Sequence, residues 1–118
     1  MPKPKKKTVK NKCDSAWGKT IHKKELCERC KRQNLLLNAH HVKCRNRYPR
    51  LRHELRNGCL LCVDCHHWAH ADPIQFSEWF KVERKDDWRW LREQTKASGR
   101  AITLQDLEVK YDELKSLN

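Results

Sequence analysis

The sequence predicts an α+β fold, a small domain in which a strand–loop–strand–helix unit is held together by zinc. Two Cys-x-x-Cys pairs, Cys27–Cys30 and Cys62–Cys65, have the spacing of paired zinc knuckles. The chain has 118 residues, of which 37% are hydrophobic and 36% are charged. A single domain with so little apolar material has a thin core, which a metal can supplement. Short apolar stretches on either side of a basic loop supply the two strands.

The N-terminal residues 1–12 contain six lysines, two prolines and no acid. This composition predicts a disordered basic arm. Such an arm can grip phosphates, act as a nuclear import signal in a eukaryote, or be a solvated tail. After it, Trp17, Ile21 and Leu26 are spaced roughly like one face of a helix. We expect a short helix within residues 13–26 that packs Trp17 and Ile21 against the metal-bearing domain.

The central segments alternate between apolar and basic character. Residues 34–42 are apolar, which predicts a first strand, and residues 43–56 are basic and loop-like. Gly58–Cys62 is a short apolar run that predicts the second strand. A helix is then expected from Cys65 to Ala71, beginning at the second knuckle.

Two helix starts are visible in the C-terminal part. Asp72 can cap a helix with Pro73 at its first position and Gln75 closing a capping box, and Thr103 to Asp106 resembles another capped start. The apolar faces of these helices are Phe76, Trp79 and Phe80 in the first and Leu104, Leu107, Tyr111 and Leu114 in the second. We expect the aromatic rings to be core, and the second stripe to dock on the domain rather than pair with another chain. The predicted division is an arm at 1–12, the metal-bearing domain at 13–95 and an appended C-terminal helix at 96–118.

The seven cysteines favour zinc over disulfides. The number is odd and the N-terminus lacks the apolar region of a secretory signal, so a reduced compartment is expected. A redox Cys-x-x-Cys needs a βαβ context that is missing here. Cys59 and Cys62 also have the Cys-x-x-Cys spacing, so Cys59 is an alternative ligand. Strand alternation points its side chain into the core, however, where we expect it to act as a small hydrophobic residue. We assign no role to Cys13 or Cys44.

Four histidines and an asparagine form a second set of chemically useful residues. His40 and His41 end the first strand, Asn57 follows 16 residues after His41, and His66 and His70 are four residues apart. Residues four apart share a helix face, so His66, His70 and His40 can hold one divalent cation. His41 is then expected to be a free imidazole that faces the substrate. This set suits phosphodiester hydrolysis, because an imidazole can deprotonate water at neutral pH and a metal can stabilise charge on the phosphate.

These motifs resemble those of a known family. The order His-His-Val, Leu-Arg-Asn-Gly and Leu-Cys-x-x-Cys-His-x-x-x-His is similar to the HNH, or His-Me finger, endonucleases with a ββα-metal fold, particularly their zinc-containing phage and prophage members. The similarity runs from Cys27 to Trp79. It implies roles residue by residue: His41 matches the general base, Asn57 the residue that orients the base loop, and His66 and His70 metal ligands. His40 stands where many members have a metal-binding Asp or His.

The charge of the chain favours a polyanionic partner. Lys and Arg number 27 against 15 Asp and Glu, which gives a net charge of +12. No apolar run is long enough for a membrane span, so DNA is the expected partner, contacted mainly at its phosphates. The arginines expected to make these contacts are Arg45, Arg47, Arg50, Arg52 and Arg56. They would supply affinity and salt dependence with little sequence information.

The sequence therefore predicts a small metal-dependent endonuclease that nicks DNA and leaves 5′-phosphate and 3′-hydroxyl ends. Structural Zn²⁺ is expected at the cysteines, and Mg²⁺ or Mn²⁺ at the histidines, with Zn²⁺ or Ni²⁺ as alternatives because three imidazoles make a soft site. A non-catalytic zinc-ribbon DNA-binding module and an RNA-directed nuclease remain as rival interpretations. The resemblance implies an intracellular phage or prophage product in a bacterial cytoplasm, a monomer or weak dimer, with packaging or recombination proteins as further partners.

Overall fold

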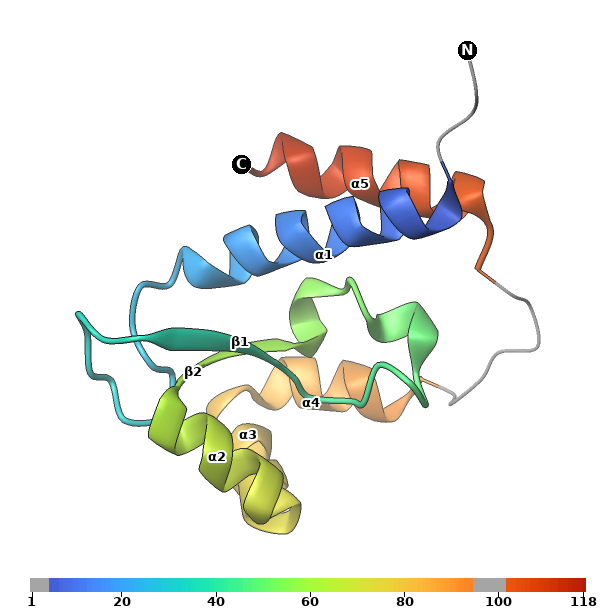
Figure 1. The fold of residues 1–118 in the computed structure, drawn as a ribbon. Coiled ribbons are helices and arrows are strands. Elements are labelled where there is room, and N and C mark those ends of the chain that lie inside the picture. The colour runs from blue at the N-terminus through green and yellow to red at the C-terminus, as the bar shows by residue number, and fades with distance from the viewer. Residues whose placement is uncertain (1–4, 95–101) are drawn as a thin grey trace.

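The computed structural model describes residues 5–94 and 102–118, in which a two-stranded antiparallel sheet is combined with five α-helices (Figure 1). The α+β class predicted from the sequence is confirmed. The elements, in chain order, are α1 (Lys6–His22), β1 (Leu37–His41), η1 (Pro49–Leu51), η2 (Leu55–Asn57), β2 (Gly58–Cys62), α2 (Val63–Ala71), α3 (Pro73–Glu83), α4 (Lys85–Arg92) and α5 (Leu104–Ser116).

Helix α1 corrects the prediction of a disordered basic arm. Residues 6–12 form the first turns of this helix, and residues 1–4 lie outside the described part of the chain. The helix forms because Val9 and Cys13 are buried against Leu107 of α5. That contact joins segments about 100 residues apart, so the local composition of the arm could not reveal it. The boundary predicted at residue 13 therefore falls inside α1, and the one predicted at 95–96 lies outside the described residues.

The sheet pairs the two strands in antiparallel register, with Leu37 opposite Cys62 and His41 opposite Gly58. The second strand has the predicted bounds, whereas the first is shorter than the predicted 34–42. Cys62 and His41 therefore lie at opposite ends of the sheet. This arrangement separates the cysteine-bearing end from the end where His41 leaves β1.

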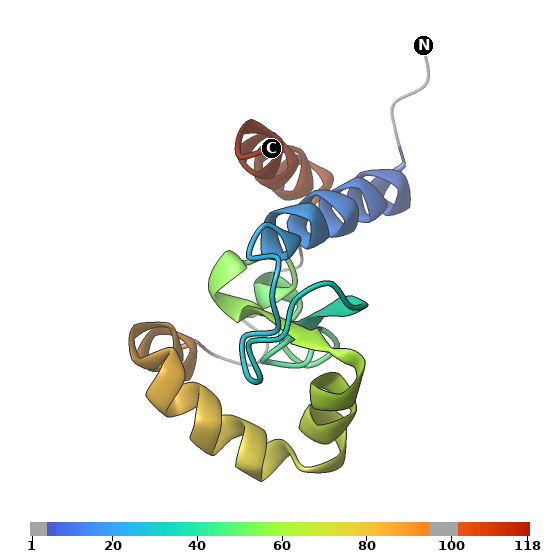
Figure 2. The ribbon, with the colours of Figure 1, turned by 90° about the vertical axis from the view of Figure 1, so that its left-hand side faces the viewer.

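The two faces of the sheet are covered by different helices (Figures 1 and 2). Leu60 packs with Trp17 and Ile21 of α1, as the sequence predicts for these two side chains. A Cβ atom on Gly58 would lie 2.3 Å from Ile21 Cδ1, so glycine is required for α1 to approach β2. Cys59 belongs to the opposite core and is fully buried, which agrees with its interpretation as a small hydrophobe.

The opposite core is aromatic and is built by the helices that follow β2. Asp72 caps α3 by accepting the backbone N–H of Gln75 at 3.2 Å, with Pro73 at the first position, as predicted. The predicted capping box with Gln75 does not form, because the backbone N–H of Asp72 donates to the Trp68 carbonyl at 2.8 Å instead. Phe76 and Phe80 on this helix are buried, and their rings stack with centroids 5.8 Å apart. Leu91 of α4 is buried in the same cluster. The aromatic face of α3 is therefore core, in agreement with the prediction.

Helix α5 lies along α1, and the two helices run side by side on one side of the molecule (Figures 1 and 2). Its predicted start is confirmed, because Thr103 and Asp106 form a reciprocal capping box. Leu107 and Leu114 are buried against α1, so the apolar stripe docks on the domain as expected.

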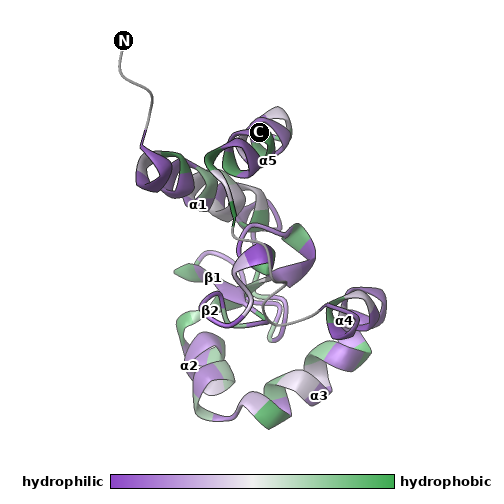
Figure 3. Ribbon diagram, turned by 90° about the vertical axis from the view of Figure 1, so that its right-hand side faces the viewer, coloured by the Kyte–Doolittle hydropathy of each residue, from purple (hydrophilic) through white to green (hydrophobic). Residues whose placement is uncertain are grey.

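Polar residues dominate much of the ribbon, including most of α1 and α4, with hydrophobic residues at intervals (Figure 3). No helix within residues 5–94 and 102–118 has both the length and the apolar character needed to cross a bilayer.

Candidate metal centres

The four cysteines predicted to bind zinc lie together in the structure. The sulfur atoms of Cys27, Cys30, Cys62 and Cys65 are all within 4.8 Å of one another. The Cys30 and Cys62 sulfurs are 3.8 Å apart. A tetrahedral zinc with Zn–S bonds of about 2.3 Å requires sulfurs about 3.8 Å apart. The thiol groups therefore have the number, chemistry and spacing of a closed zinc site.

The surroundings of the cysteines supply positive charge and backbone hydrogen bonds. Arg32 donates from Nε to Cys30 at 3.2 Å and from Nη2 to Cys62 at 3.5 Å. Hydrogen bonds from the side chain and the backbone of Arg32 to Cys30 lower the pKa of this thiol to about 6. Burial instead raises the pKa of Cys65, although Arg29 donates to its sulfur at 3.6 Å. A cation is therefore the natural means of keeping all four sulfurs as thiolates at neutral pH.

A buried ion pair, which the sequence pattern did not reveal, fixes the first knuckle to the sheet. Glu28 accepts the backbone N–H of Leu60 at 2.6 Å and the Arg84 guanidinium at 3.1 Å. The same Arg84 Nη1 donates to the carbonyl of Gly58 at 2.7 Å. The Glu28 and Arg84 side chains are only 7% and 12% exposed. Glu28, which lies inside the first knuckle, is thus anchored to β2 both directly through Leu60 and indirectly through Arg84.

The three histidines predicted to share a cation also come together. The ring nitrogens of His40, His66 and His70 offer ligand atoms within 4.8 Å of one another, and the Nε2 atoms of His66 and His70 are 3.1 Å apart. Burial and the neighbouring imidazoles lower the pKa of His40 to about 3. Neutral imidazoles are the metal-binding form. Three donors leave positions on a bound metal open, as in catalytic sites.

His41 occupies a different environment from its neighbour His40. Its ring stacks on Trp17 with centroids 4.2 Å apart, and its Nε2 lies 2.9 Å from the carbonyl oxygen of Arg52. A carbonyl only accepts, so Nε2 carries the hydrogen and the neutral ring keeps its lone pair on Nδ1. Burial lowers the pKa of His41, against the opposing effect of this hydrogen bond. The ring is therefore a neutral base of defined tautomer at pH 7.

Asn57 holds the loop that follows His41. The side chain is fully buried; its Oδ1 accepts the backbone N–H of Lys43 at 2.7 Å, and its Nδ2 donates to the carbonyls of Lys43 and Leu51 at 3.1 Å. The backbone carbonyl of Asn57 also accepts the N–H of Val42 at 2.9 Å. Both ends of the loop are therefore tied together, as expected for an asparagine that holds the His41 loop.

Asp14 is the centre of a hydrogen-bond network that the sequence did not predict. Arg52 donates from Nε and Nη2 to the two carboxylate oxygens of Asp14, both at 2.8 Å, and His53 Nε2 lies 2.7 Å from Asp14 Oδ1. Burial would raise the pKa of Asp14, but these hydrogen bonds hold it below its ordinary value. Asp14 thus holds the residue whose carbonyl orients His41, while Trp17, one turn further along α1, stacks on His41 and donates from Nε1 to the Glu54 carbonyl at 2.9 Å. The i, i+3 spacing was visible in the sequence, but the partners were not.

The five arginines predicted to contact phosphates lie in different environments. Arg45 and Arg47 are exposed on the loop, and Arg50 is half-buried. Arg52 departs from the prediction, because its guanidinium is paired with Asp14 and only 17% exposed. Arg56 is exposed and lies over the ring of Trp90, 5.1 Å from its centroid. Arg56 also lies within ion-pair distance of a carboxylate, with its Nε 3.9 Å from Asp87 Oδ1.

No protein-family model, curated protein or solved structure matched the chain. The two residue clusters and the His41 loop are therefore the features from which a function can be inferred.

Proposed function

We propose that this protein is a metal-dependent endonuclease of the HNH type that hydrolyses DNA phosphodiester bonds. The observation that carries the proposal is the state of His41: a neutral imidazole, held by the Arg52 carbonyl, adjacent in sequence to a cluster of three imidazoles. A general base needs an unprotonated nitrogen and a fixed orientation, and His41 has both. A zinc-binding scaffold alone requires neither feature.

In the proposed reaction, Nδ1 of His41 takes a proton from a water molecule, and the water oxygen forms a bond to the phosphorus atom. The bond between phosphorus and the 3′ oxygen breaks, and this oxygen takes up a proton from water. The products are a 5′-phosphate and a 3′-hydroxyl. The hydrogen bond from Nε2 to the Arg52 carbonyl supports the imidazolium formed in this step. Asn57 keeps that carbonyl in place through the loop.

A divalent metal held by His40, His66 and His70 would stabilise negative charge on the scissile phosphate and the leaving oxygen. Imidazole ligands favour zinc, nickel or manganese over magnesium, so the metal that binds most tightly can differ from the one that supports cleavage. A single site of this kind cuts one strand, which makes nicking the expected primary outcome.

A plasmid-relaxation assay tests the proposal. Protein loaded with one zinc is incubated with supercoiled plasmid and with Mg²⁺, Mn²⁺, Ni²⁺ or added Zn²⁺. We expect open-circular plasmid to appear before linear plasmid, and DNA ligase to reseal the nicks because the ends are 5′-phosphate and 3′-hydroxyl. Protein that binds DNA in a gel but nicks it with none of these metals would instead be a zinc-ribbon binding module. A parallel RNA digestion identifies an RNA-directed enzyme.

Asp14 is expected to be a positioning residue for this reaction. Asp14→Asn removes the charged acceptor shared by Arg52 and His53, which loosens the carbonyl that orients His41. Misplacement of a catalytic group costs up to about 100-fold in rate, so we expect nicking to fall about 10- to 100-fold. The measurement is the nicking rate, with DNA affinity and zinc content determined on the same sample.

Asp112→Asn on α5 is the matched control, because Asp112 is exposed. It should nick at the wild-type rate. If Asp14→Asn also nicks at that rate while remaining folded, Asp14 has no positioning role.

A further inference from the structure

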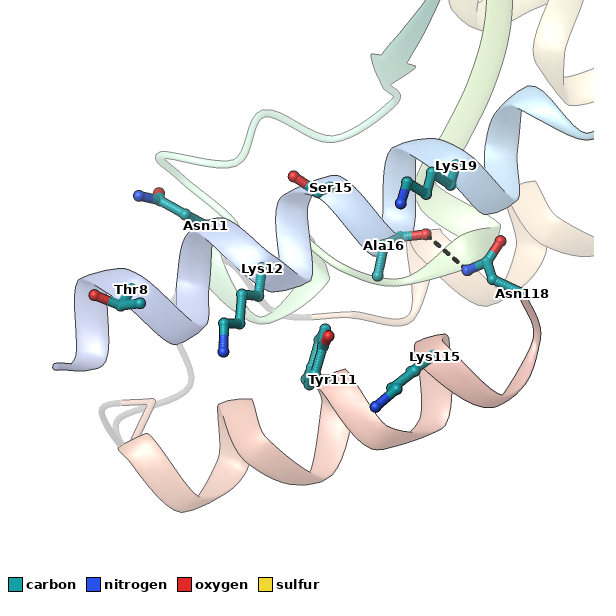
Figure 4. Close-up of a pocket in the computed structure, with 9 residues that line it drawn as sticks. All are labelled: Thr8, Asn11, Lys12, Ser15, Ala16, Lys19, Tyr111, Lys115 and Asn118. Atoms are coloured by element: carbon teal, nitrogen blue, oxygen red, sulfur yellow. Dashed lines mark hydrogen bonds between the residues drawn. The ribbon is translucent and has the colours of Figure 1, made fainter. Parts of the chain in front are cut away.

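A groove between α1 and α5 carries a concentration of lysines outside the two metal centres (Figure 4). It is open to solvent and has a volume of about 400 Å³. Its lining includes three lysines, a tyrosine and short polar side chains; the residues used below are Thr8, Asn11, Lys12, Lys19, Tyr111 and Lys115. In Figure 4, Lys12 extends from α1 toward α5, Tyr111 projects from α5 toward α1, and Lys19 lies over α1.

The charged side chains that line this groove are all lysines. No acidic residue lines it, although the chain has 15 Asp and Glu. The Nζ atoms of Lys12 and Lys115 lie 5.8 and 6.0 Å from the centroid of the same Tyr111 ring. Within residues 5–94 and 102–118, none of the three lysines has a carboxylate partner at salt-bridge distance. The ammonium groups are therefore available to an external anion.

The spacing of the lysines is set by packed helices. Leu107 and Leu114 fix α5 against α1, and the Asn118 amide donates to Thr20 Oγ1 and to the Leu114 carbonyl, both at 3.0 Å. Lys12 and Lys19 are seven residues apart on α1, about 10 Å along the helix axis. A single small anion cannot bridge that separation, whereas a chain of phosphates can. Hydroxyl and amide groups such as Thr8 and Asn11 are further donors suited to phosphate oxygens.

We propose that this groove binds the phosphodiester backbone of double-stranded DNA at a site separate from the point of cleavage; the choice of DNA rests on the proposed function. Contacts from three lysines add affinity and salt dependence without reading sequence. Helix α1 connects the two regions, because its Asp14 and Trp17 hold the His41 loop while its lysines line the groove. DNA held by the groove is thereby attached to the helix that supports the base.

The test measures binding without cleavage, in a His41→Ala background. One variant carries Lys12→Gln, Lys19→Gln and Lys115→Gln. The matched control carries Lys85→Gln, Arg89→Gln and Arg92→Gln, which removes the same charge from exposed side chains of α4 outside the groove. The dissociation constant for a short duplex is measured by fluorescence anisotropy between about 50 and 200 mM salt. Thermal unfolding confirms that both variants are folded.

We expect the slope of log K against log salt to fall by about 2 to 3 in the groove variant, since each lost phosphate contact removes about 0.9. The control should change the slope by less than about 1. Equal changes in both variants would overturn the proposal, because net charge alone would explain them. A groove variant that loses affinity for polyglutamate but not for DNA would overturn it in favour of an acidic peptide.

These experiments distinguish failure of the groove proposal from failure of the proposed nuclease function. If the wild type never nicks DNA but the groove variant selectively loses DNA binding, the groove is supported and the nuclease assignment fails. If the wild type nicks and the two variants bind DNA equally, the groove proposal alone fails.

Discussion

Replacing His41 with alanine is expected to lower the rate of plasmid nicking by about 10²- to 10⁴-fold, the usual contribution of a general base. The physical reason is that Nδ1 of His41 carries the lone pair, while Nε2 is committed to the Arg52 carbonyl. The variant should retain its zinc and its affinity for DNA, because His41 belongs to neither the cysteine cluster nor the three-histidine cluster. Nicking rates at saturating metal measure the effect.

The pH dependence of the reaction gives a second measure of the same group. Burial lowers the pKa of His41 below its ordinary value. A base is active when unprotonated, so the rate should rise with pH through a pKa below about 6.5 and then level off. This rising limb should be absent from the residual activity of His41→Ala.

His67→Ala is the matched control for this experiment. His67 is exposed on α2, outside the three-histidine cluster. Its replacement should leave the nicking rate within about twofold of wild type, since His67 has no role in the proposed reaction. An unchanged rate in His41→Ala would exclude His41 as the base, and an equal loss in both variants would indicate a general effect of removing histidines.

Short-range signals predicted much of the fold and the composition of both clusters. Gly58–Cys62 was recognisable because five small or apolar residues lie between a basic loop and a knuckle. The start of α3 was recognisable because Asp72 and Pro73 combine a cap with a residue suited to the first helical position. Two Cys-x-x-Cys turns and a pair of histidines four residues apart encode part of their geometry locally, and the structure brings the four cysteines together and the three histidines together, as predicted.

The parts that could not be predicted depend on contacts between distant segments. Helix α1 begins earlier than expected because α5, at the other end of the chain, covers Val9 and Cys13. Arg52 resembled its basic neighbours in sequence, and only the position of Asp14, 38 residues earlier, shows that it is paired. Glu28 and Arg84 are 56 residues apart and form a buried pair that no local pattern indicates.

Removal of the metal from the four-cysteine cluster is expected to abolish cooperative unfolding. Structural zinc contributes about 10–16 kcal/mol in small zinc domains, whereas whole domains are stable by about 5–15 kcal/mol. Cys27 and Cys30 lie in the turn before β1, and Cys62 and Cys65 join β2 to α2, so one ion connects three parts of the fold. Cys30→Ser should therefore lose its zinc and its sharp thermal transition. Zinc content and tryptophan fluorescence during heating measure both.

Two further cysteine variants determine whether the assignment of ligands is correct. Cys44→Ser should retain zinc and wild-type stability, because Cys44 is exposed. Cys59→Ser should also retain zinc but lose about 1–3 kcal/mol, since it introduces a hydroxyl at a fully buried position. Cys59 and Cys65 each form a Cys-x-x-Cys pair with Cys62. If Cys59→Ser loses zinc and Cys65→Ser retains it, Cys59 is the fourth ligand and Cys65 is not. If Cys30→Ser retains its zinc and its thermal transition, the fold does not depend on a four-thiolate site. The small core would then have to be stabilised by the Glu28–Arg84 ion pair and by aromatic packing instead.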